Sequence, residues 1–298
     1  MPTDPMILAI DQGMTNTKAI LVDGSGQVRG IASRPVDIEF PRPAWVQQDA
    51  ARIWQSVREA VDEVLEAAGS PQLVAVGVSN QRESGLAWDS ASGEPVGPVV
   101  TWQCRRSAAF CDQLRTEGHE ADVRARTGLP IDPMFTGAKI RWLLDDADDG
   151  QARAADGSIR VGTVDSWLLW NLTGGGQHRT DASNASRTQL FNISERAWDP
   201  TLLETFGVPA AALPEVLPSS AVFGETMKLG ALPAGIPIGS LVGDSHAALF
   251  AHAGFAESSV KATYGTGSSL MMPTAQRVDS RGGLAATIAW GLDSTIYA

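Results

Sequence analysis

Short apolar runs separated by polar turns open the chain. Residues 6–10, 19–22 and 28–32 are mainly apolar runs of strand length, and Asp, Asn, Ser and Gly fill the turns between them. Three such runs in succession predict three short strands joined as a meander. This order differs from the strand–loop–helix order of a dinucleotide-binding unit and therefore disfavours that fold.

A helical period follows. Between Asp49, a favoured N-cap residue, and Gly69, a favoured stop, apolar residues recur every three or four positions. We expect an amphipathic helix there and further helices at 106–116, 137–146, 167–172 and 247–252, with Asp165 and Ser166 capping the helix at 167–172. Residues 145–157 predict a solvated loop or the ragged end of a helix.

Apolar runs between these helices predict further strands, at 73–78, 86–88, 99–102, 159–164 and 236–242. Strands that alternate with helices are typical of an α/β fold. Beyond Gly254 the pattern changes to short strand-like pieces at 260–263, 270–272, 284–289 and 295–297. Because no predicted helix covers these pieces, we expect them to leave a face or an edge uncovered.

The length of 298 residues exceeds the size at which a single hydrophobic core keeps growing, so two lobes are expected. We place the first lobe at residues 1–253 and the beginning of an incomplete second lobe at 254–298. The apolar fraction of 43% and the charged fraction of 19% are those of a packed chain rather than a disordered one.

The charge balance limits the partners. Lys and Arg number 23 and Asp and Glu number 34, which gives a net charge of -11. This sign disfavours nucleic acid and anionic membranes as partners, so an anionic ligand has to be held locally.

The two cysteines, Cys104 and Cys111, suit a reducing compartment, and the chain lacks a signal-peptide pattern and an apolar run of membrane-spanning length. We therefore expect a cytoplasmic protein.

Two turns have the composition of phosphate-binding hairpins. The run DQGMTNTK at 11–18 and the run YGTGSS at 264–269 combine Gly with hydroxyl side chains, and their backbone N–H groups could line an anion. A carboxylate beside phosphates is tolerated when Mg²⁺ lies between them, which gives Asp11 a metal role and Lys18 a charge-neutralising one. Alone, the first turn is equally compatible with an ordinary hairpin and the second favours one, and the pairing of the two favours a nucleotide site.

Two polar groups at predicted strand ends are the candidates for substrate chemistry. Asp244 follows the strand at 236–242 and could accept a proton from a substrate hydroxyl, although it could also cap the helix near Ala247. Arg82 and Glu83 offer a donor fork and an acceptor for neighbouring hydroxyls, and a surface salt bridge is the alternative. Trp102 suits an apolar wall or a core position, and His246 suits packing or capping.

Together the motifs resemble the FGGY family of carbohydrate kinases, and within it the glycerol kinase branch. The resemblance covers nearly the whole chain. It implies an α/β, actin-like (ribonuclease H-like) two-domain kinase fold and ATP-dependent, Mg²⁺-assisted phosphorylation of a polyol or sugar hydroxyl. The motifs are AIDQG (9–13), SNQRE (79–83), WQCRR (102–106), GLPIDP (128–133), MFTGAKIRWLLDD (134–146), GTVDSWL (162–168), DASNASR (181–187) and YGTG (264–267).

The resemblance also implies roles for individual residues. Asp244 matches the catalytic base, Asp11 the residue that organises Mg²⁺, Arg82 and Glu83 the hydroxyl-binding pair, and Trp102 a substrate-packing position. The residues that match the ATP-binding hairpins are Gly13, Thr15, Asn16 and Lys18 in the first and Gly265, Thr266 and Gly267 in the second.

Three substrate-binding positions depart from the glycerol kinase pattern. Met134 replaces a Tyr, Ser245 replaces a Gln next to the catalytic Asp, and Ser269 replaces a Phe. These changes remove hydrogen-bonding groups and an apolar wall, so we expect a substrate other than glycerol, such as a larger polyol or a ketose.

Family members carry a second lobe of comparable size, so the resemblance also predicts that the chain is truncated and that these 298 residues bind ATP weakly and turn over slowly or not at all. A homo-oligomer is compatible with the resemblance. A non-catalytic, actin-like module that binds a sugar or a nucleotide is the alternative function.

Overall fold

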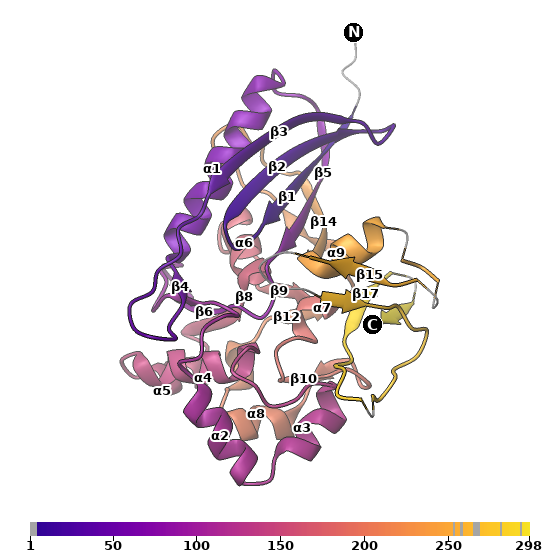
Figure 1. The fold of residues 1–298 in the computed structure, drawn as a ribbon. Coiled ribbons are helices and arrows are strands. Elements are labelled where there is room, and N and C mark those ends of the chain that lie inside the picture. Colours follow the sequence, from indigo (N-terminus) through magenta and orange to yellow (C-terminus); the bar gives the residue numbers. More distant parts are fainter. Residues whose placement is uncertain (1–4, 253, 257–258, 265–268, 281, 293) are drawn as a thin grey trace.

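The computed structural model describes residues 5–252, 254–256, 259–264, 269–280, 282–292 and 294–298. Its largest sheet contains β1 (Met6–Gln12), β2 (Asn16–Asp23), β3 (Val28–Pro35), β5 (Leu73–Asn80), β13 (Ser220–Glu225) and β14 (Pro237–Gly243). The strand order is β13-β14-β5-β1-β2-β3 (Figure 1). Antiparallel pairing of β1 with β2 and of β2 with β3 confirms the predicted meander. Because β5 and β14 continue the sheet parallel to β1, the arrangement is the ribonuclease H-like one.

Side-chain alternation fixes which face of this sheet is buried. In β1, Leu8 and Ile10 are buried on one face, whereas Ile7 on the other face is exposed. The buried face packs against α1 (Ala50–Ala67) and α6 (Val164–Leu172) in one hydrophobic core. The predicted caps of α1 are confirmed, because the Asp49 carboxylate accepts from the Ala51 N–H at 2.8 Å and Gly69 has a φ of +71°.

A second sheet lies below the first in the view of Figure 1, with most of the remaining helices around it. Its strands, in order, are β4 (Gln47–Gln48), β7 (Val99–Val100), β6 (Gly85–Asp89) and β8 (Ile159–Thr163). The helices are α2 (Ala108–Thr116), α3 (Glu120–Thr127), α4 (Thr136–Asp146), α5 (Gly150–Ala155), α8 (Pro200–Phe206) and the 3-10 turn η1 (Ala210–Ala212).

Several boundaries in this part differ from the sequence predictions. The strand predicted at 99–102 ends at Val100, and Trp102 lies in the turn that follows. The helices α3 and α8 were not predicted, and α5 lies within the expected loop at 145–157. The capping role predicted for Asp165 and Ser166 is wrong, because α6 begins at Val164 with Thr163 as its N-cap. Asp165 is buried and accepts hydrogen bonds from Thr163 and Thr180 instead.

From Arg179 onward, several further elements lie outside the two larger sheets. They are β9 (Arg179–Asp181) paired with β12 (Glu215–Leu217), α7 (Ala182–Ala185), β10 (Phe191–Asn192) paired with β11 (Ala197–Trp198), α9 (Asp244–Ala251), and the hairpins β15 (Lys261–Thr263) with β16 (Ser269–Met271) and β17 (Ile288–Gly291) with β18 (Thr295–Tyr297).

The expectation of an uncovered C-terminal segment is correct for one hairpin and wrong for the other. Leu270 of β16 is 72% exposed, whereas Ile288 of β17 is fully buried and packs with Ala185 and Phe191. Gly128 allows this packing, because a Cβ at its φ of +74° would lie 2.8 Å from the carbonyl oxygen of Ala286. The lobe boundary near residue 254 stays a prediction.

Among the residues that the structure describes, no helix combines the length and the apolar character needed to cross a membrane.

Candidate active site

Three parallel strands bring the predicted substrate residues together. Register pairs Gln12 of β1 with Asn80 of β5, and Asn80 with Gly243 of β14. The carboxyl ends of these strands therefore meet at one edge of the sheet, which is where ligands bind in open α/β sheets. This arrangement brings Asp11, Arg82 and Asp244 close together, although Arg82 and Asp244 are 162 positions apart in the chain.

Asp244 is the first residue of α9, and Gly243 is the N-cap. The alternative of a capping role for Asp244 is therefore wrong. Its Oδ1 accepts from Arg82 Nε at 3.1 Å, while 43% of its side chain stays exposed. Burial raises the pKa of the Asp244 carboxyl; the Arg82 charge opposes this rise, and the charges of Glu83 and Asp11 add to it. The group is accessible and more basic than an ordinary carboxylate.

Glu83 is buried and Arg82 is half-buried, with side-chain exposures of 3% and 13%, which excludes the alternative of a surface salt bridge. Glu83 Oε1 accepts from Arg187 Nε at 2.7 Å. Burial favours the neutral acid, but the charges of Arg82 and Arg187 and the hydrogen bond from Arg187 outweigh it and lower the Glu83 pKa. Glu83 also has a φ of +61°, a strained conformation typical of functional sites.

Gly243 lets the Arg82 side chain lie against the end of β14. A Cβ at this position would lie 2.6 Å from both Cγ and Cδ of Arg82. Such a distance is far below van der Waals contact, so only glycine fits beside the arginine stem.

The first predicted phosphate hairpin is the turn between β1 and β2. The Gly13 N–H donates to the Asn16 carbonyl at 2.9 Å and closes the turn. Thr15, Asn16 and Lys18 are exposed, and Lys18 pairs directly opposite Asp11 in the antiparallel register. Directly opposed side chains share a face of the sheet, so the Lys18 and Asp11 side chains lie on the same face.

Asp11 is suited to Mg²⁺ that arrives with a nucleotide. Asp11 Oδ1 accepts from Ser79 Oγ at 2.7 Å, which orients the carboxylate. The described residues contain no cluster of three His, Cys, Asp or Glu side chains that could hold a metal ion by themselves. Mg²⁺ commonly takes only one or two carboxylates and completes its shell with water and phosphate oxygens, so the residues present fit this mode.

Two predicted substrate contacts are held near Glu83. The Trp102 N–H donates to Ser84 Oγ at 3.2 Å, and Thr136 Oγ1 donates to the Glu83 carbonyl at 3.1 Å. Met134, two residues before Thr136, has its carbonyl bound by the ammonium of Lys139. Trp102 and Met134 are half-buried, as is Ser245 beside Asp244.

The second predicted phosphate hairpin is described only at its ends. Gly265, Thr266 and Gly267 lie outside the described residues, so their predicted contact with ATP stays a prediction. Ser269 begins β16, is half-buried and pairs with Thr263.

Four buried groups at the site carried no predicted chemical role. Arg187 binds Glu83, and Lys139 holds the segment around Met134 with a pKa lowered by burial to about 7. Burial and the Arg82 charge lower the pKa of Lys261, and the Asp244 charge opposes them. His246 is fully buried and packs behind Gly243, as the packing alternative predicted. The motifs DASNASR and MFTGAKIRWLLDD contain Arg187 and Lys139 and were the available signal.

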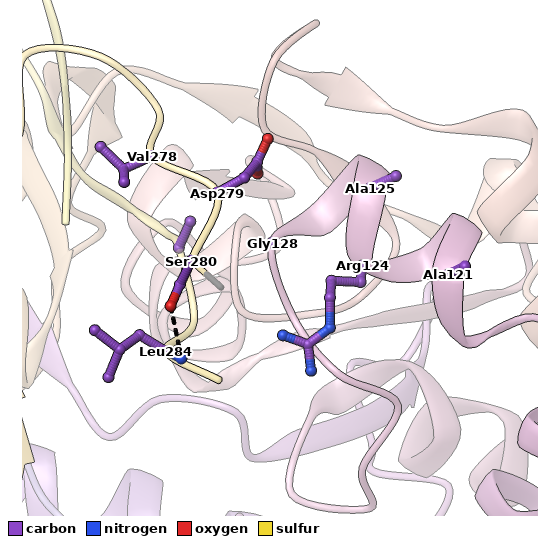
Figure 2. Close-up of a pocket in the computed structure, with 9 residues that line it drawn as sticks. Ala121, Arg124, Ala125, Gly128, Val278, Asp279, Ser280 and Leu284 are labelled. Atoms are coloured by element: carbon purple, nitrogen blue, oxygen red, sulfur yellow. Dashed lines mark hydrogen bonds between the residues drawn. The ribbon is translucent and has the colours of Figure 1, made fainter. Parts of the chain in front are cut away.

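A separate cavity of about 290 Å³ lies between α3 and the segment around residues 278–286 (Figure 2). Ser280 and Leu284 close one side of it through a hydrogen bond from the Leu284 N–H to Ser280 Oγ at 3.1 Å. None of its lining residues is a predicted site residue, so the strand-end constellation stays the candidate site.

Comparison with known sequences gives consistent matches. The model of the FGGY family of carbohydrate kinases, N-terminal domain, matches residues 6–251. The chain is 45% identical over 297 residues to a glycerol kinase of Halalkalibacterium halodurans and 47% identical over 296 residues to one of Alkalilimnicola ehrlichii. These alignments cover 99% and 98% of this chain and 60% of each relative. The chain thus spans about three fifths of the length of these relatives.

Solved structures agree with the fold. The crystal structure of Plasmodium falciparum glycerol kinase with ADP matches with a TM-score of 0.94 at 27% identity, over 99% of this chain and 60% of that one. A xylulose kinase from Rhodospirillum rubrum matches with a TM-score of 0.88 at 22% identity, over 98% of this chain and 59% of that one, and this likeness concerns the fold alone. The sheet order, the motifs at the strand ends and the family match lead to one conclusion: the chain belongs to the FGGY family of carbohydrate kinases.

Proposed function

We propose that this protein transfers the γ-phosphoryl group of ATP to a hydroxyl of a polyol or sugar, with Asp244 as the general base. The observation that carries the proposal is the Asp244–Arg82–Glu83 constellation at the same strand edge as Asp11. Membership of the carbohydrate kinase family and the crystal structure of the Plasmodium falciparum glycerol kinase with ADP support a nucleotide-dependent reaction.

In the proposed reaction, Arg82 and Glu83 bind neighbouring hydroxyls of the acceptor. Glu83 Oε1 is bound to Arg187, and among the described residues no hydrogen bond reaches its Oε2, which is suited to accept from a hydroxyl. Asp244 takes the proton of the reacting hydroxyl as that oxygen bonds to the γ-phosphorus and the bond to the bridging oxygen of ADP breaks. Asp11 would hold Mg²⁺ that binds with the nucleotide, and the ion would supply charge neutralisation on the phosphates.

The acceptor is proposed to be larger than glycerol. The relatives at 45% and 47% identity are glycerol kinases, which supports a polyol. Met134, Ser245 and Ser269 occupy the three departing positions, and each offers less hydrogen bonding or a smaller apolar wall than the residue expected there.

The test is a panel of acceptors with ATP and Mg²⁺. ADP formation is measured in a coupled assay with glycerol, four- and five-carbon polyols and ketoses, and the binding of each acceptor is measured by calorimetry. Transfer to the larger acceptors with the higher kcat/KM supports the proposal. A far higher kcat/KM for glycerol overturns the substrate assignment. Because these 298 residues span about three fifths of the relatives' length and are expected to turn over slowly or not at all, transfer is also measured on a chain extended to the relatives' length. Acceptor binding without any transfer in that longer chain favours the non-catalytic, actin-like module, and no binding at all overturns both.

A further inference from the structure

The segment Asp181–Arg187, which contains α7, is buried and polar. Asp181, Ser183, Asn184 and Ser186 are all fully buried, and Arg187 is 8% exposed. Polar side chains are costly to bury unless each has partners, so a segment with this composition is expected to make specific contacts. Its contacts reach two different parts of the molecule.

Toward the active site, the segment binds the ends of two strands. Ser183 Oγ accepts from the Gly243 N–H at 3.0 Å and donates to Asp181 Oδ1 at 3.0 Å. Asn184 and Asn80 exchange side-chain hydrogen bonds of 3.0 and 3.1 Å. Gly243 directly precedes Asp244, and Asn80 ends β5, so these contacts fix the edge on which the base lies.

The same segment also orients the predicted hydroxyl-binding pair. Arg187 Nε donates to Glu83 Oε1 at 2.7 Å. Arg82 in turn lies against Gly243 so tightly that a Cβ there would lie 2.6 Å from its side chain. A shift of Gly243 would therefore displace Arg82 as well as Asp244.

Toward the C-terminus, the segment holds β17. Ser186 Oγ accepts from the Ile288 N–H at 3.2 Å and shares a hydrogen bond of 2.7 Å with Thr287 Oγ1. At the other end of β17, the Gly291 N–H donates to Ser219 Oγ at 3.1 Å, and Ser219 Oγ donates to Asp181 Oδ2 at 2.6 Å. Figure 1 shows β17 beside α7.

Ordinary helix capping accounts for only part of this network. Asp181 caps α7 by accepting from the Ser183 and Asn184 N–H groups. Capping needs neither the Ser183 hydroxyl on Gly243 nor the Ser186 hydroxyl on Ile288, because both of these partners lie outside the helix.

We propose that Ser183 is a positioning residue for Asp244, and that the segment Asp181–Arg187 links the placement of β17 to that of Asp244 and Glu83. The proposal rests on the proposed function for its catalytic consequence, but its structural core, the fixing of Gly243 by Ser183, is independent of any activity.

The test uses Ser183→Ala, with Ser166→Ala as a matched control. Ser166 is also fully buried, and its hydroxyl has no hydrogen-bond partner among the described residues. Hydrogen exchange is measured by NMR on the whole chain. In Ser183→Ala the Gly243 amide is expected to exchange about tenfold faster while distant core amides keep their rates, and Ser166→Ala leaves Gly243 unchanged. Ser183→Thr, which keeps the hydroxyl, is expected to restore slow exchange.

A second readout follows the base itself. When Gly243 shifts, the contact between Asp244 and Arg82 weakens, so the Asp244 pKa followed by NMR titration is expected to rise in Ser183→Ala. In an active enzyme kcat falls about tenfold to a hundredfold, with acceptor affinity unchanged within twofold. If a wild-type chain extended to the relatives' length shows no transfer, the proposed function fails, and the exchange and titration data still decide the positioning role.

Ser186→Ala tests the link to β17. Faster exchange of both Ile288 and Gly243 supports the link, and faster exchange of Ile288 alone overturns it. Unchanged Gly243 exchange and an unchanged Asp244 pKa in Ser183→Ala would overturn the positioning role. If Ser183→Ala raised amide exchange equally throughout the chain, Ser183 would be a general structural residue, and this result would also overturn the positioning role.

Discussion

The two hairpins that the sequence marked as phosphate-binding differ in their support. The β1–β2 hairpin lies inside the six-stranded sheet, with β5 on one side and β3 on the other, and Thr17 and Leu21 of β2 are fully buried. Within the part of the chain that the structure describes, the β15–β16 hairpin pairs only with itself, and Leu270 and Tyr264 are 72% and 82% exposed. The two hairpins therefore have similar sequences, but the β1–β2 hairpin is much more buried than the β15–β16 hairpin.

The difference shows which half of the site is preorganised. Two-stranded hairpins are marginal in water unless a further element covers them, whereas a strand inside a sheet is fixed before any ligand binds. Asp244, which we propose as the base, the predicted hydroxyl-binding pair Arg82 and Glu83, and Asp11 all lie on the embedded side. Lys261 is the one described residue of β15 that is buried, and its pKa responds to Arg82 and Asp244. The charge of Lys261 therefore interacts with those of Arg82 and Asp244, which links the exposed hairpin to the embedded half of the site.

The largest expected effect comes from Asp244→Asn on the embedded side. The amide cannot accept the hydroxyl proton, so kcat is expected to fall by about 10²- to 10⁴-fold with acceptor binding retained. Wild-type activity should also rise with pH through the raised pKa of Asp244, and the variant should lack this rise. The coupled assay from low to neutral pH measures both. Wild-type activity in the variant would remove Asp244 from the reaction.

Matched leucine substitutions compare the two hairpins directly. Leu21→Ala removes a fully buried side chain and is expected to lower the free energy of unfolding by about 2–5 kcal/mol. Leu270→Ala, at 72% exposure, should change it by less than about 0.5 kcal/mol. Urea denaturation measures both. Similar losses in the two variants would show that the second hairpin is as well supported as the first.

Asp165→Asn tests whether the buried Asp165 carboxyl of α6 keeps its proton in the folded protein. Burial and then the Asp181 charge raise the Asp165 pKa from 3.8 to about 7. Between these values the unfolded chain has lost its proton while the folded protein keeps it, so stability falls as pH rises from about 4 to about 7. The shift corresponds to at most roughly 4 kcal/mol. Asn cannot titrate, so denaturation midpoints of the variant should lack this decline. The same decline in both proteins would assign it to other groups.

Sequence patterns predicted the strands whose apolar residues lie in the main core. The meander, α1 with its caps, and β5 and β14 followed from hydrophobic periodicity and from Asp49 and Gly69. The helix α3 was missed because it buries only Val123 and Thr127, which leaves almost no apolar period to detect. The strand predicted at 284–289 begins at Ile288 instead, since Leu284 is 75% exposed and only tertiary packing against α7 selects the buried residues.

The candidate site was predictable to a similar degree. Asp11 is the last residue but one of β1, and Arg82, Glu83 and Asp244 follow the ends of β5 and β14. Parallel neighbours bring such strand ends together. Arg187 and Ser183 could not be assigned from local pattern, because their roles depend on α7 packing against strands about 60 and 104 positions away. Contacts of this kind are set by the tertiary fold and leave no periodic signal in the sequence.

The smallest expected effect comes from a pair of glycines on one strand. Gly243→Ala places a Cβ 2.6 Å from Arg82, so the arginine has to move, and we expect a loss of about 1–3 kcal/mol of stability together with weaker acceptor binding. Gly239→Ala meets nothing within 4 Å and should change stability by less than about 0.5 kcal/mol. Calorimetry of acceptor binding and urea denaturation separate the two effects. Because both glycines lie in β14, equal behaviour would mean that the close approach of Arg82 to Gly243 is not what preorganises the embedded half of the site.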